Sequence, residues 1–574
     1  MRCRLILLTS LALGLAACQG PQTPSSQPNP TPPSPNPAQP PAAPRPFDGV
    51  TLHLDPSAAA GGDGSSAKAF TRFKEAYDAM KPLRTSGQRV RILFYPGTYR
   101  QQLFEEQQTP FWGIPESDAT LTLEAKTPGT AVISGSDVWR DWQAQGGGRW
   151  TRAWPYNFGA TIPKWGGPPI PAGAARREAV WVAGERLKQV LEPAKLESGG
   201  FFVDVGAKQI TLQLAGGIDP NTAQTEVAVR GQLLYIWNIS NFTLRGLTFT
   251  HSADGFAQSA VAAQRGQGKR CKNFTVDNVR IIENGQGGLE SYCDNTVIKN
   301  SAVNANGFAG MLGGISSGWL VEDSETNRNG WRSWAFGYKG WATAGLKFGL
   351  VSDIVIRRHR SLENEADGLW IDTQNVNVTI EDSLIARNKW DGLFLEASDG
   401  PFLARNNTIC NNGLSDLILG SVRQVRFENN RVLSFAAPNT EVPNQNLALL
   451  LGETRRKEPG DGGETNRAEY PLREITLIGN TFAAGPGRGL VASYWYFSDQ
   501  KDPNSFEISS DFEMFIASFK STGNTWYASV AKPFSIASKQ LGYAEDRDLA
   551  GWRTVTGQDA DSSFSDPKLS CPTQ

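Results

Sequence analysis

The sequence predicts an all-β protein, a right-handed parallel β-helix of about 22–24 residues per coil with an inserted β-sandwich and an N-terminal capping helix. Asparagine recurs at spacings of 22, 23, 35, 24 and 24 residues, with a short apolar strand downstream of each copy. Such a period, with short strands and polar turns, is typical of a solenoid with three strands per coil. The asparagines are Asn284, Asn306, Asn329, Asn364, Asn388 and Asn412.

A strand begins four residues after every asparagine but one. These strands start at Gly288, Gly310, Gly345, Gly368, Gly392 and Asp416. The exception carries about 12 extra residues, which lie between Asn329 and Gly345. Asparagine suits a fixed turn position, because stacked side-chain amides satisfy one another and the turn backbone. Leucine-rich repeats are the alternative, but their Leu-rich consensus and a helix per repeat are missing.

The N-terminus has the features of an export signal. Arg2 and Arg4 precede an apolar run that is too short for a permanent membrane helix and ends in Leu-Ala-Ala-Cys at Cys18. This tetrapeptide resembles a bacterial lipobox, so we expect residues 1–18 to be a lipoprotein signal and Cys18 to be lipidated. The protein would then be exported and anchored in the cell envelope, at the outer membrane or cell surface. An ordinary signal peptide is the alternative.

The remaining chain divides by composition. Residues 19–47 are Pro-rich and predict an extended tether. Residues 48–136 contain an apolar stripe at helical spacing and then the first coils, so the helix would cap the solenoid. Residues 137–231 break the coil pattern and alternate like antiparallel strands, which predicts the inserted β-sandwich. Residues 232–574 form the main β-helix and its C-terminal cap. The stripe is Phe70, Phe73, Tyr77 and Met80 within residues 67–80.

Charge and histidine content exclude some partners. The net charge of -1 is spread over mixed acidic and basic residues, so nucleic acid is not an expected partner. The three histidines, His53, His251 and His359, are too scattered for a His-rich zinc site, and we expect no metal or cofactor.

Cys271 and Cys293 are 22 residues apart and fall at the same position of successive coils. Neighbouring strands lie about 4.8 Å apart, a separation that a disulfide can bridge. The two cysteines therefore predict a disulfide, with two buried free thiols as the alternative.

Two strands, "GLWID" and "GLFLE", end in different acids at the same coil position. Alternation sends Leu369 and Ile371 inward and Asp372 outward, and likewise sends Glu396 outward. One outward column reads Tyr292, Gly314, Gly349, Asp372, Glu396 and Gly420. The neighbouring column reads Glu290, Leu312, Lys347, Trp370, Phe394 and Ile418.

The acid pair predicts hydrolytic chemistry. Carboxyl groups on neighbouring strands can stand about 5 to 5.5 Å apart, as in retaining glycosidases, whereas inverting enzymes need about 6.5 to 9.5 Å. At about 5 Å two negative charges repel by roughly 3 kcal/mol at an effective dielectric of about 20. We therefore expect one carboxyl to be protonated and the other ionised. Lys347 would favour Asp372 as the ionised nucleophile, leaving Glu396 as the acid/base.

Aromatic residues near the acids predict a sugar-binding groove, because aromatic rings stack on sugar faces. Trp331, Trp334 and Trp341 crowd the extra residues, and Trp370 and Trp390 lie nearby. The expected substrate-binding residues are Lys347, Trp370, Phe394, Trp341, Trp334, Glu290 and Tyr292. Three alternatives stay open: solvated surface acids, a calcium-dependent polysaccharide lyase, and a non-catalytic polysaccharide-binding surface.

With "GLWID" and "LFLEASDGPFLARNN", the chain resembles the β-helix β-xylosidases of glycoside hydrolase family 120, within the pectate-lyase-like superfold. The resemblance spans most of the chain after about Gly49, and its specific part is the segment from Asp372 to Asn407. The resemblance implies an inserted β-sandwich, a retaining double displacement, Asp372 as nucleophile and Glu396 as acid/base. Thr373 and residues 397–399 differ from the family pattern, so the resemblance does not fix the sugar, which would be part of an oligosaccharide or polysaccharide.

Overall fold

The structure, a computed structural model, describes residues 47–103, 119–158, 169–265, 271–442, 445–454, 472–496, 510–537 and 544–573. The chain divides into two compact units, Met1–Gly49 with Lys457–Glu469 and Val50–Arg456 with Tyr470–Gln574. All helices and strands described below lie in the second unit. The predicted signal, Cys18 and all but the last residue of the predicted tether lie outside the described residues.

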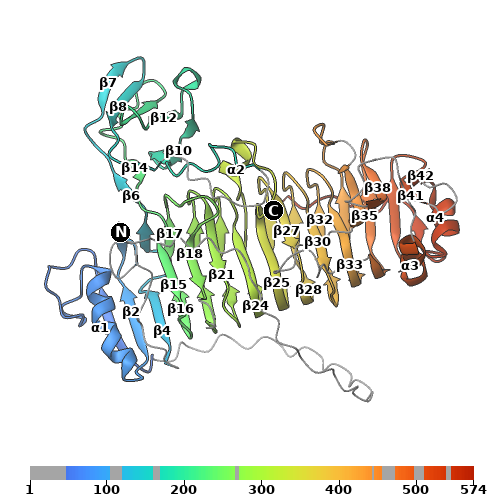
Figure 1. The fold of residues 1–574 in the computed structure, drawn as a ribbon, viewed down its shortest axis with the longest axis horizontal. Helices are drawn as coiled ribbons and strands as arrows, with labels where there is room; N and C mark the ends of the chain where they lie inside the picture. The colour runs from blue at the N-terminus through green and yellow to red at the C-terminus, as the bar shows by residue number, and fades with distance from the viewer. Residues whose placement is uncertain are drawn as a thin grey trace, which may run out of the picture. The chain divides into compact units, whose positions relative to one another are not determined.

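The second unit is built around a parallel β solenoid with three strand positions per coil, as the asparagine period predicts (Figure 1). One coil consists of β27 (Asp367–Ile371), β28 (Val376–Glu381) and β29 (Leu384–Ala386). Each strand pairs in parallel with the equivalent strand of the next coil, for example Leu369 with Leu393. The coils therefore form three faces.

The first face, which carries the acid pair, consists of β15 (Leu234–Trp237), β18 (Ser259–Gln264), β21 (Gly287–Ser291), the start of β24 (Met311–Glu322), the start of β25 (Ala344–Arg357), β27, β30 (Leu393–Ser398), the start of β33 (Leu417–Glu428), β35 (Leu447–Thr454), β38 (Gly489–Tyr496) and β41 (Phe534–Ala537).

The second face consists of β1 (Val50–Leu54), β2 (Val90–Phe94), β4 (Leu121–Ala125), β16 (Phe242–Arg245), β19 (Phe274–Asp277), β22 (Val297–Lys299), the ends of β24, β25 and β33, β28, β31 (Phe402–Arg405), β36 (Arg473–Ile478) and β39 (Lys520–Thr522).

The third face is split into two sheets. Its first five strands are β3 (Gly97–Tyr99), β5 (Ala131–Ser134), β17 (Thr248–Thr250), β20 (Arg280–Ile282) and β23 (Ala302–Asn304). The other seven are β26 (Arg360–Leu362), β29, β32 (Thr408–Cys410), β34 (Arg431–Ser434), β37 (Thr481–Ala484), β40 (Thr525–Ala528) and β43 (Ser563–Phe564). Glu325 bridges the split through isolated pairings with Ala302 and Arg360.

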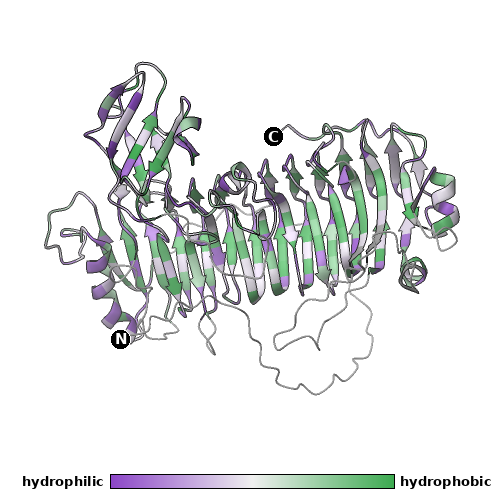
Figure 2. Cartoon of the chain, turned by 45° about the horizontal axis from the view of Figure 1, so that its top comes forward, coloured by the Kyte–Doolittle hydropathy of each residue, from purple (hydrophilic) through white to green (hydrophobic). Residues whose placement is uncertain are grey.

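The interior of the coils is apolar (Figure 2). Leu369, Ile371, Leu393 and Leu395 are buried, as the alternation predicts. Each such side chain contributes about 1.5–3 kcal/mol relative to exposure, and a shift by one residue would turn all of them outward. Burial therefore fixes which side chains of these strands face out.

The six predicted asparagines form a continuous ladder. Each side-chain amide donates to the amide oxygen of the next asparagine at 2.8–3.0 Å, from Asn284 to Asn412. Asn412 donates to Asp416 at 2.7 Å, so the ladder ends on a carboxylate. Arg488, with a guanidinium nitrogen 3.8 Å from Asp416, compensates this buried charge.

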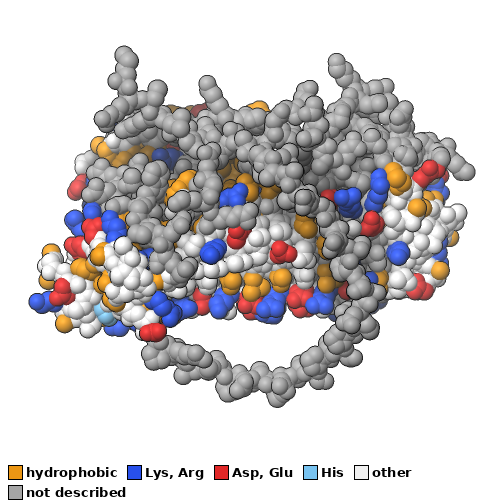
Figure 3. Space-filling view, turned by 60° about the horizontal axis from the view of Figure 1, so that its bottom comes forward, with side chains coloured by type: hydrophobic (Ala, Val, Ile, Leu, Met, Phe, Trp, Pro, Cys, Tyr) orange, Lys and Arg blue, Asp and Glu red, His pale blue; other side chains and the backbone are white. Residues whose placement is uncertain are grey.

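The second face carries a column of alternating charges. In register order the column is Glu124, Arg245, Asp277, Lys299, Glu322, Arg357, Glu381, Arg405 and Glu428. Neighbours form ion pairs, such as Arg357 with Glu322 at 2.7 Å. Acidic and basic side chains alternate along one edge of Figure 3. These charges satisfy one another along the solenoid axis.

The predicted capping helix is present but begins later than expected. α1 spans Phe73–Thr85, whereas the apolar stripe predicts a helix within residues 67–80. Phe70 pairs instead with Leu54 in an isolated bridge, so it is extended, although its side chain is still buried. The helix starts where Glu75 accepts hydrogen bonds from the backbone of Thr71 and Arg72.

Between Ser136 and Ala228 the chain leaves the coils and forms two small, mostly antiparallel sheets with their own apolar core, here called the inserted sandwich (Figure 1). The strands of one sheet are β6 (Ser136–Val138), β9 (Val180–Val182), β10 (Glu185–Arg186) and β14 (Thr225–Ala228). The strands of the other are β7 (Gln143–Gly146), β8 (Arg149–Ala153), β11 (Lys188–Val190), β12 (Gly200–Asp204) and β13 (Gln209–Gln213).

The predicted disulfide between Cys271 and Cys293 is confirmed, with a Cα–Cα distance of 4.7 Å between successive coils. A second disulfide joins Cys410 to Cys571. The remaining helices are α2 (Trp331–Ala335), α3 (Ser510–Ser518) and α4 (Leu549–Thr556), and β42 (Ala544–Arg547) pairs antiparallel with β41. Among the described residues, no helix combines the length and apolar character needed to cross a membrane.

Candidate functional site

Both predicted outward columns are present on the first face. Lys347 pairs with Trp370 and Trp370 with Phe394, while Glu396 pairs with Gly420. Asp372 follows Ile371, which pairs with Leu395, so Asp372 and Glu396 occupy neighbouring coils on the same face. Strand spacing puts their backbones about 4.8 Å apart.

Asp372 is held by a cation and a hydroxyl. Lys347 Nζ lies 2.7 Å from Asp372 Oδ2, which confirms the predicted proximity of the two side chains. Thr373 Oγ1 donates to Asp372 Oδ1 at 3.0 Å. Both contacts stabilise the ionised carboxylate, since a nearby cation and a donated hydrogen bond favour the charged form.

Glu396 is held by an indole. Trp370 Nε1 donates to Glu396 Oε2 at 2.9 Å, and the Glu396 side chain is buried. The two carboxyl groups therefore sit in different surroundings, one beside an ammonium group and the other beside a neutral donor. In a site with two carboxyl groups, different surroundings give the groups different pKa values and therefore different roles.

Trp370 has both ring faces occupied. Lys347 Nζ lies 3.2 Å from the centroid of its indole, and Phe394 stacks at 5.5 Å with an interplanar angle of 10°. The sequence predicts Trp370 as a sugar-binding ring, but the structure leaves no ring face for stacking. Its indole instead orients Lys347 and Glu396.

Glycines flank the acids in the Asp372 column. A Cβ placed on Gly349 or on Gly452 would meet no described heavy atom within 4 Å outside the adjacent residues. A Cβ on Gly314 would lie 2.5 Å from the ring of Tyr292, which covers that glycine. The column is thus open over Gly349, next to Asp372, whereas a Cβ on Gly420, next to Glu396, would lie 3.2 Å from the ring of Phe394. Tyr292 bounds the column at Gly314.

Tyr292 and Glu290 lie further along the two columns, three coils before Asp372. Burial raises the pKa of Glu290, and the side chains of Tyr292 and Gln264 form hydrogen bonds with it. The adjacent carboxylate of Glu290 and burial raise the pKa of Tyr292. These two predicted sugar contacts form a cluster that is separate from the acid pair.

The extra residues lie in α2 and the segment after it, and residues 331–343 are here called the Trp loop. Trp341 is 45% exposed, and its ring lies 6.0 Å from Lys347 Nζ. Trp334 packs instead against Trp390 at 6.0 Å and beneath Lys339 Nζ at 4.5 Å. Of the three tryptophans in the loop, Trp341 is the one that a described contact joins to the acid site.

Ser398 is a residue of the site whose role the sequence did not indicate. Its hydroxyl donates to the carbonyl oxygens of Asp372 at 2.7 Å and Glu396 at 2.8 Å and accepts from the backbone of Asn375 at 3.0 Å. It therefore ties the turn after one acid to the strand of the other. Ser398 is one of the positions that differ from the β-xylosidase pattern, and that difference was its only signal.

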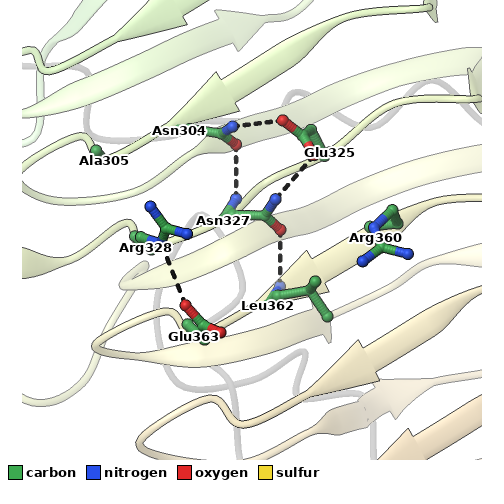
Figure 4. Close-up of a pocket in the computed structure, with 8 residues that line it drawn as sticks. All are labelled: Asn304, Ala305, Glu325, Asn327, Arg328, Arg360, Leu362 and Glu363. Atoms are coloured by element: carbon green, nitrogen blue, oxygen red, sulfur yellow. Dashed lines mark hydrogen bonds and ion pairs between the residues drawn. The ribbon is translucent and has the colours of Figure 1, made fainter. Parts of the chain in front are cut away.

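A polar cavity of about 300 Å³ lies at the split of the third face, away from the predicted site residues (Figure 4). Its side chains bond to one another: Asn304 donates to Glu325 at 2.6 Å, and Arg328 pairs with Glu363 at 3.1 Å. This cavity has the contacts of a structural polar network. Among the described residues, no group of three or more His, Cys, Asp or Glu side chains is arranged to hold a metal ion.

Comparison with known proteins identifies the fold. Residues 232–432 match the family model described as "Right handed beta helix region". The solenoid is a right-handed parallel β-helix. No curated protein sequence matches the chain.

The solved structures similar to this β-helix chain include the following two. One, "The complex structure of XylC with xylose", is 14% identical with a TM-score of 0.59, over 91% of this chain and 87% of that chain. The other, the mannuronan C-5 epimerase AlgE4 A-module of Azotobacter vinelandii, is 12% identical with a TM-score of 0.45, over 89% of this chain and 100% of that chain. At 14% identity the similarity to XylC concerns the fold alone.

Proposed function

We propose that the chain is a retaining glycoside hydrolase in which Asp372 is the nucleophile and Glu396 the acid/base. The observation that carries the proposal is the placement of two carboxylates on neighbouring coils of one face, one bound by Lys347 and the other by Trp370. A coil spacing of about 4.8 Å is close to the carboxyl separation of about 5–5.5 Å that retention requires.

In the first step, an Asp372 oxygen attacks the anomeric carbon while Glu396 gives its proton to the departing glycosidic oxygen. The bond to the leaving group breaks and a glycosyl ester on Asp372 forms. Lys347 keeps Asp372 ionised before the attack. Trp370 holds the Glu396 carboxyl toward the leaving oxygen.

In the second step, Glu396 takes a proton from water, and the water oxygen attacks the anomeric carbon. The ester bond to Asp372 breaks, so the carboxylate returns to its ion pair with Lys347 and the sugar leaves with its original configuration. The open space over Gly349 gives room for a sugar ring beside Asp372.

The substrate is proposed to be a β-linked xyloside or related oligosaccharide. The similar fold of XylC, which was solved with xylose, supports this choice, as does the strand pattern shared with the β-helix β-xylosidases. The positions that differ from that pattern, Thr373 and residues 397–399, directly follow the two acids, so the panel of substrates below identifies the sugar.

Export and lipid anchoring through Cys18 are part of the proposal. The two disulfides support an oxidising compartment, since disulfides are rare in reducing ones. Cells that express the chain should incorporate an alkyne-labelled fatty acid into it, and Cys18→Ser should abolish the label. Equal labelling of the variant would contradict lipidation at Cys18.

The test of function uses the full chain with Cys18→Ser and a panel of aryl β-glycosides. Nuclear magnetic resonance of the first-formed sugar should show the β anomer, and Asp372→Ala should lose at least about 10⁴-fold in kcat. Asp277→Ala, which removes an acid of the second face paired with Arg245 and Lys299, is the matched control and should stay active.

Other outcomes identify the other functions. A first-formed α anomer would contradict the retaining mechanism. Calcium-dependent cleavage of a polysaccharide with an unsaturated, ultraviolet-absorbing product would identify a lyase. Binding of a polysaccharide without turnover of any substrate would identify a binding protein.

A further inference from the structure

The inserted sandwich contacts the Trp loop through one buried arginine. Arg332, on α2, is 1% exposed and extends from the loop into the sandwich. Its Nη1 donates to Gln189 Oε1 at 2.7 Å, and its Nη2 donates to the carbonyl oxygen of Glu178 at 2.7 Å. Its Nε donates to the carbonyl oxygen of Gly285 at 2.9 Å, within the solenoid. One side chain thus joins the loop, the sandwich and a coil.

A buried carboxylate, that of Glu178, lies close enough to favour the charge of Arg332. Burial lowers the pKa of Arg332 to about 10, so the guanidinium is still protonated at neutral pH. The Glu178 side chain is fully buried and forms an ion pair with Arg176 at 2.7 Å. Gln189 donates to the same carboxylate at 3.2 Å, so Gln189 is bonded to both Arg332 and Glu178. The three hydrogen bonds that Arg332 donates, each with a charged donor, hold its acceptors in one geometry.

A second contact fixes the loop from the same side. The ring of Phe336 lies so close to Gly173 that a Cβ on the glycine would be 2.0 Å from it. Gln286 of the solenoid donates to the carbonyl oxygens of Ala174 at 2.8 Å and Arg176 at 3.2 Å. The sandwich segment that carries Glu178 is therefore itself held on the coils, so the sandwich is a firm support for the loop.

The other end of the loop lies beside the acid pair. Tyr338 packs against Phe256 and Phe308 of the coils at 5.4 and 6.1 Å, and its hydroxyl contacts the carbonyl oxygen of Trp341 at 3.4 Å. Trp341 reaches Lys347, which pairs with Asp372. A continuous set of contacts runs from Gln189 to the acid site.

We propose that Gln189 and Arg332 are positioning residues through which the inserted sandwich sets the place of Trp341 in the sugar groove. The proposal rests on the proposed glycosidase function for its kinetic part. Trp341 would contact a sugar both before and during reaction, so displacing it weakens substrate binding more than it slows the bond-breaking step. The sandwich then acts on substrate affinity without touching the substrate.

The test is a double-mutant cycle in the full chain with Cys18→Ser. Gln189→Leu keeps the side-chain volume but removes the acceptor for Arg332, and Trp341→Ala removes the ring. Each single variant should raise KM for an aryl glycoside about tenfold with kcat within about twofold. The double variant should be no worse than Trp341→Ala alone, because Gln189 acts through Trp341. Multiplying effects, or a lower kcat with unchanged KM, would overturn the proposal.

Hydrogen exchange gives a readout that needs no turnover. In Gln189→Leu, amides of residues 331–343 should exchange faster while those of β27 and β30 stay protected. Gln213→Leu is the matched control, since Gln213 donates at 2.7 Å to Gly147 within the sandwich. It should change neither KM nor exchange in the Trp loop. Unchanged loop exchange in Gln189→Leu would refute the anchoring, whereas a wild-type chain that turns over no glycoside would refute the proposed function instead.

Discussion

Lys347 and Asp372 project from neighbouring coils of one face and form an ion pair of 2.7 Å in which both side chains are largely shielded from water. The exposed fractions are 9% for the lysine side chain and 14% for the aspartate side chain, so solvent screens the pair only weakly. The pair is the electrostatic basis for assigning the nucleophile to Asp372. Its removal should therefore be visible in the pH dependence of the reaction.

Lys347→Met should lower kcat/KM about 10- to 100-fold and move the acid limb of the pH profile to higher pH by about one unit or more. The sign follows from the charge, because an ammonium group favours the ionised carboxylate and its loss makes proton release harder. Lys389→Met, which breaks a more exposed pair of 2.9 Å with Glu365, is the control and should leave the profile in place. An unshifted acid limb in Lys347→Met would remove the argument for Asp372 as nucleophile.

Trp370→Phe separates the indole hydrogen bond from the aromatic stack. Phenylalanine keeps a ring between Lys347 and Phe394 but cannot donate to Glu396. We expect kcat to fall about tenfold, which corresponds to the loss of one buried hydrogen bond of about 1–1.5 kcal/mol. The same exchange at Trp334, which packs against Trp390, should leave kcat within about twofold. Equal effects at both positions would show that the hydrogen bond does not orient the acid.

Gly349→Leu places a side chain in the open space over this glycine, beside Asp372. The backbone of Gly349 does not adopt a positive φ, and a Cβ there meets nothing within 4 Å among the described residues, so the fold should tolerate the change. KM for an aryl glycoside should rise about tenfold or more while the melting temperature stays within a few degrees. Gly216→Leu, at an equally open position in the sandwich, is the control. An unchanged KM in Gly349→Leu would mean that no sugar lies over this position.

The columns could be predicted from sequence because a parallel solenoid repeats one position in every coil. The spacing of Asn364, Asn388 and Asn412 sets the register, and this register places Asp372 beside Glu396 without any knowledge of distant contacts. The proximity of Lys347 to Asp372 follows from the same register. The period predicts which residues of neighbouring coils lie side by side, and the acid pair is a contact of this kind.

Contacts between distant segments have no such period. Arg332 and Gln189 are 143 residues apart, and no repeat in the sequence indicates that one side chain meets the other. The pairing of Trp334 with Trp390 likewise depends on where the Trp loop folds back. The start of α1 was misplaced for a related reason: Phe70 fits the helical stripe, but a pairing with Leu54 holds it extended.

His359 should make the β-helix sensitive to mild acid. Its imidazole is fully buried in a stack of turn residues, where burial lowers its pKa to about 3. A histidine in an unfolded chain has a pKa near 6.5. Below that pH, His359 is therefore protonated in the unfolded chain but still neutral in the folded chain. The contribution of His359 to the free energy of unfolding is therefore fully present above about pH 6.5 and is lost as the pH falls toward 3. The loss due to this residue should be about 2 kcal/mol between pH 8 and pH 5.

His359→Ser tests this assignment, because Ser324 and Ser383 occupy the adjacent positions of the same stack, and the backbone of His359 donates to Ser383 at 3.1 Å. Urea unfolding at pH 8, 6.5 and 5 should give a smaller decrease for the variant than for the wild type, whatever its stability at pH 8. His53→Gln is the control. The imidazole of His53 is only partly buried, and its pKa is lowered by burial and by Arg91 and Lys126. Its contribution to the loss of stability between pH 8 and pH 5 should therefore be smaller. Parallel decreases for wild type and His359→Ser would show that another group causes the acid sensitivity.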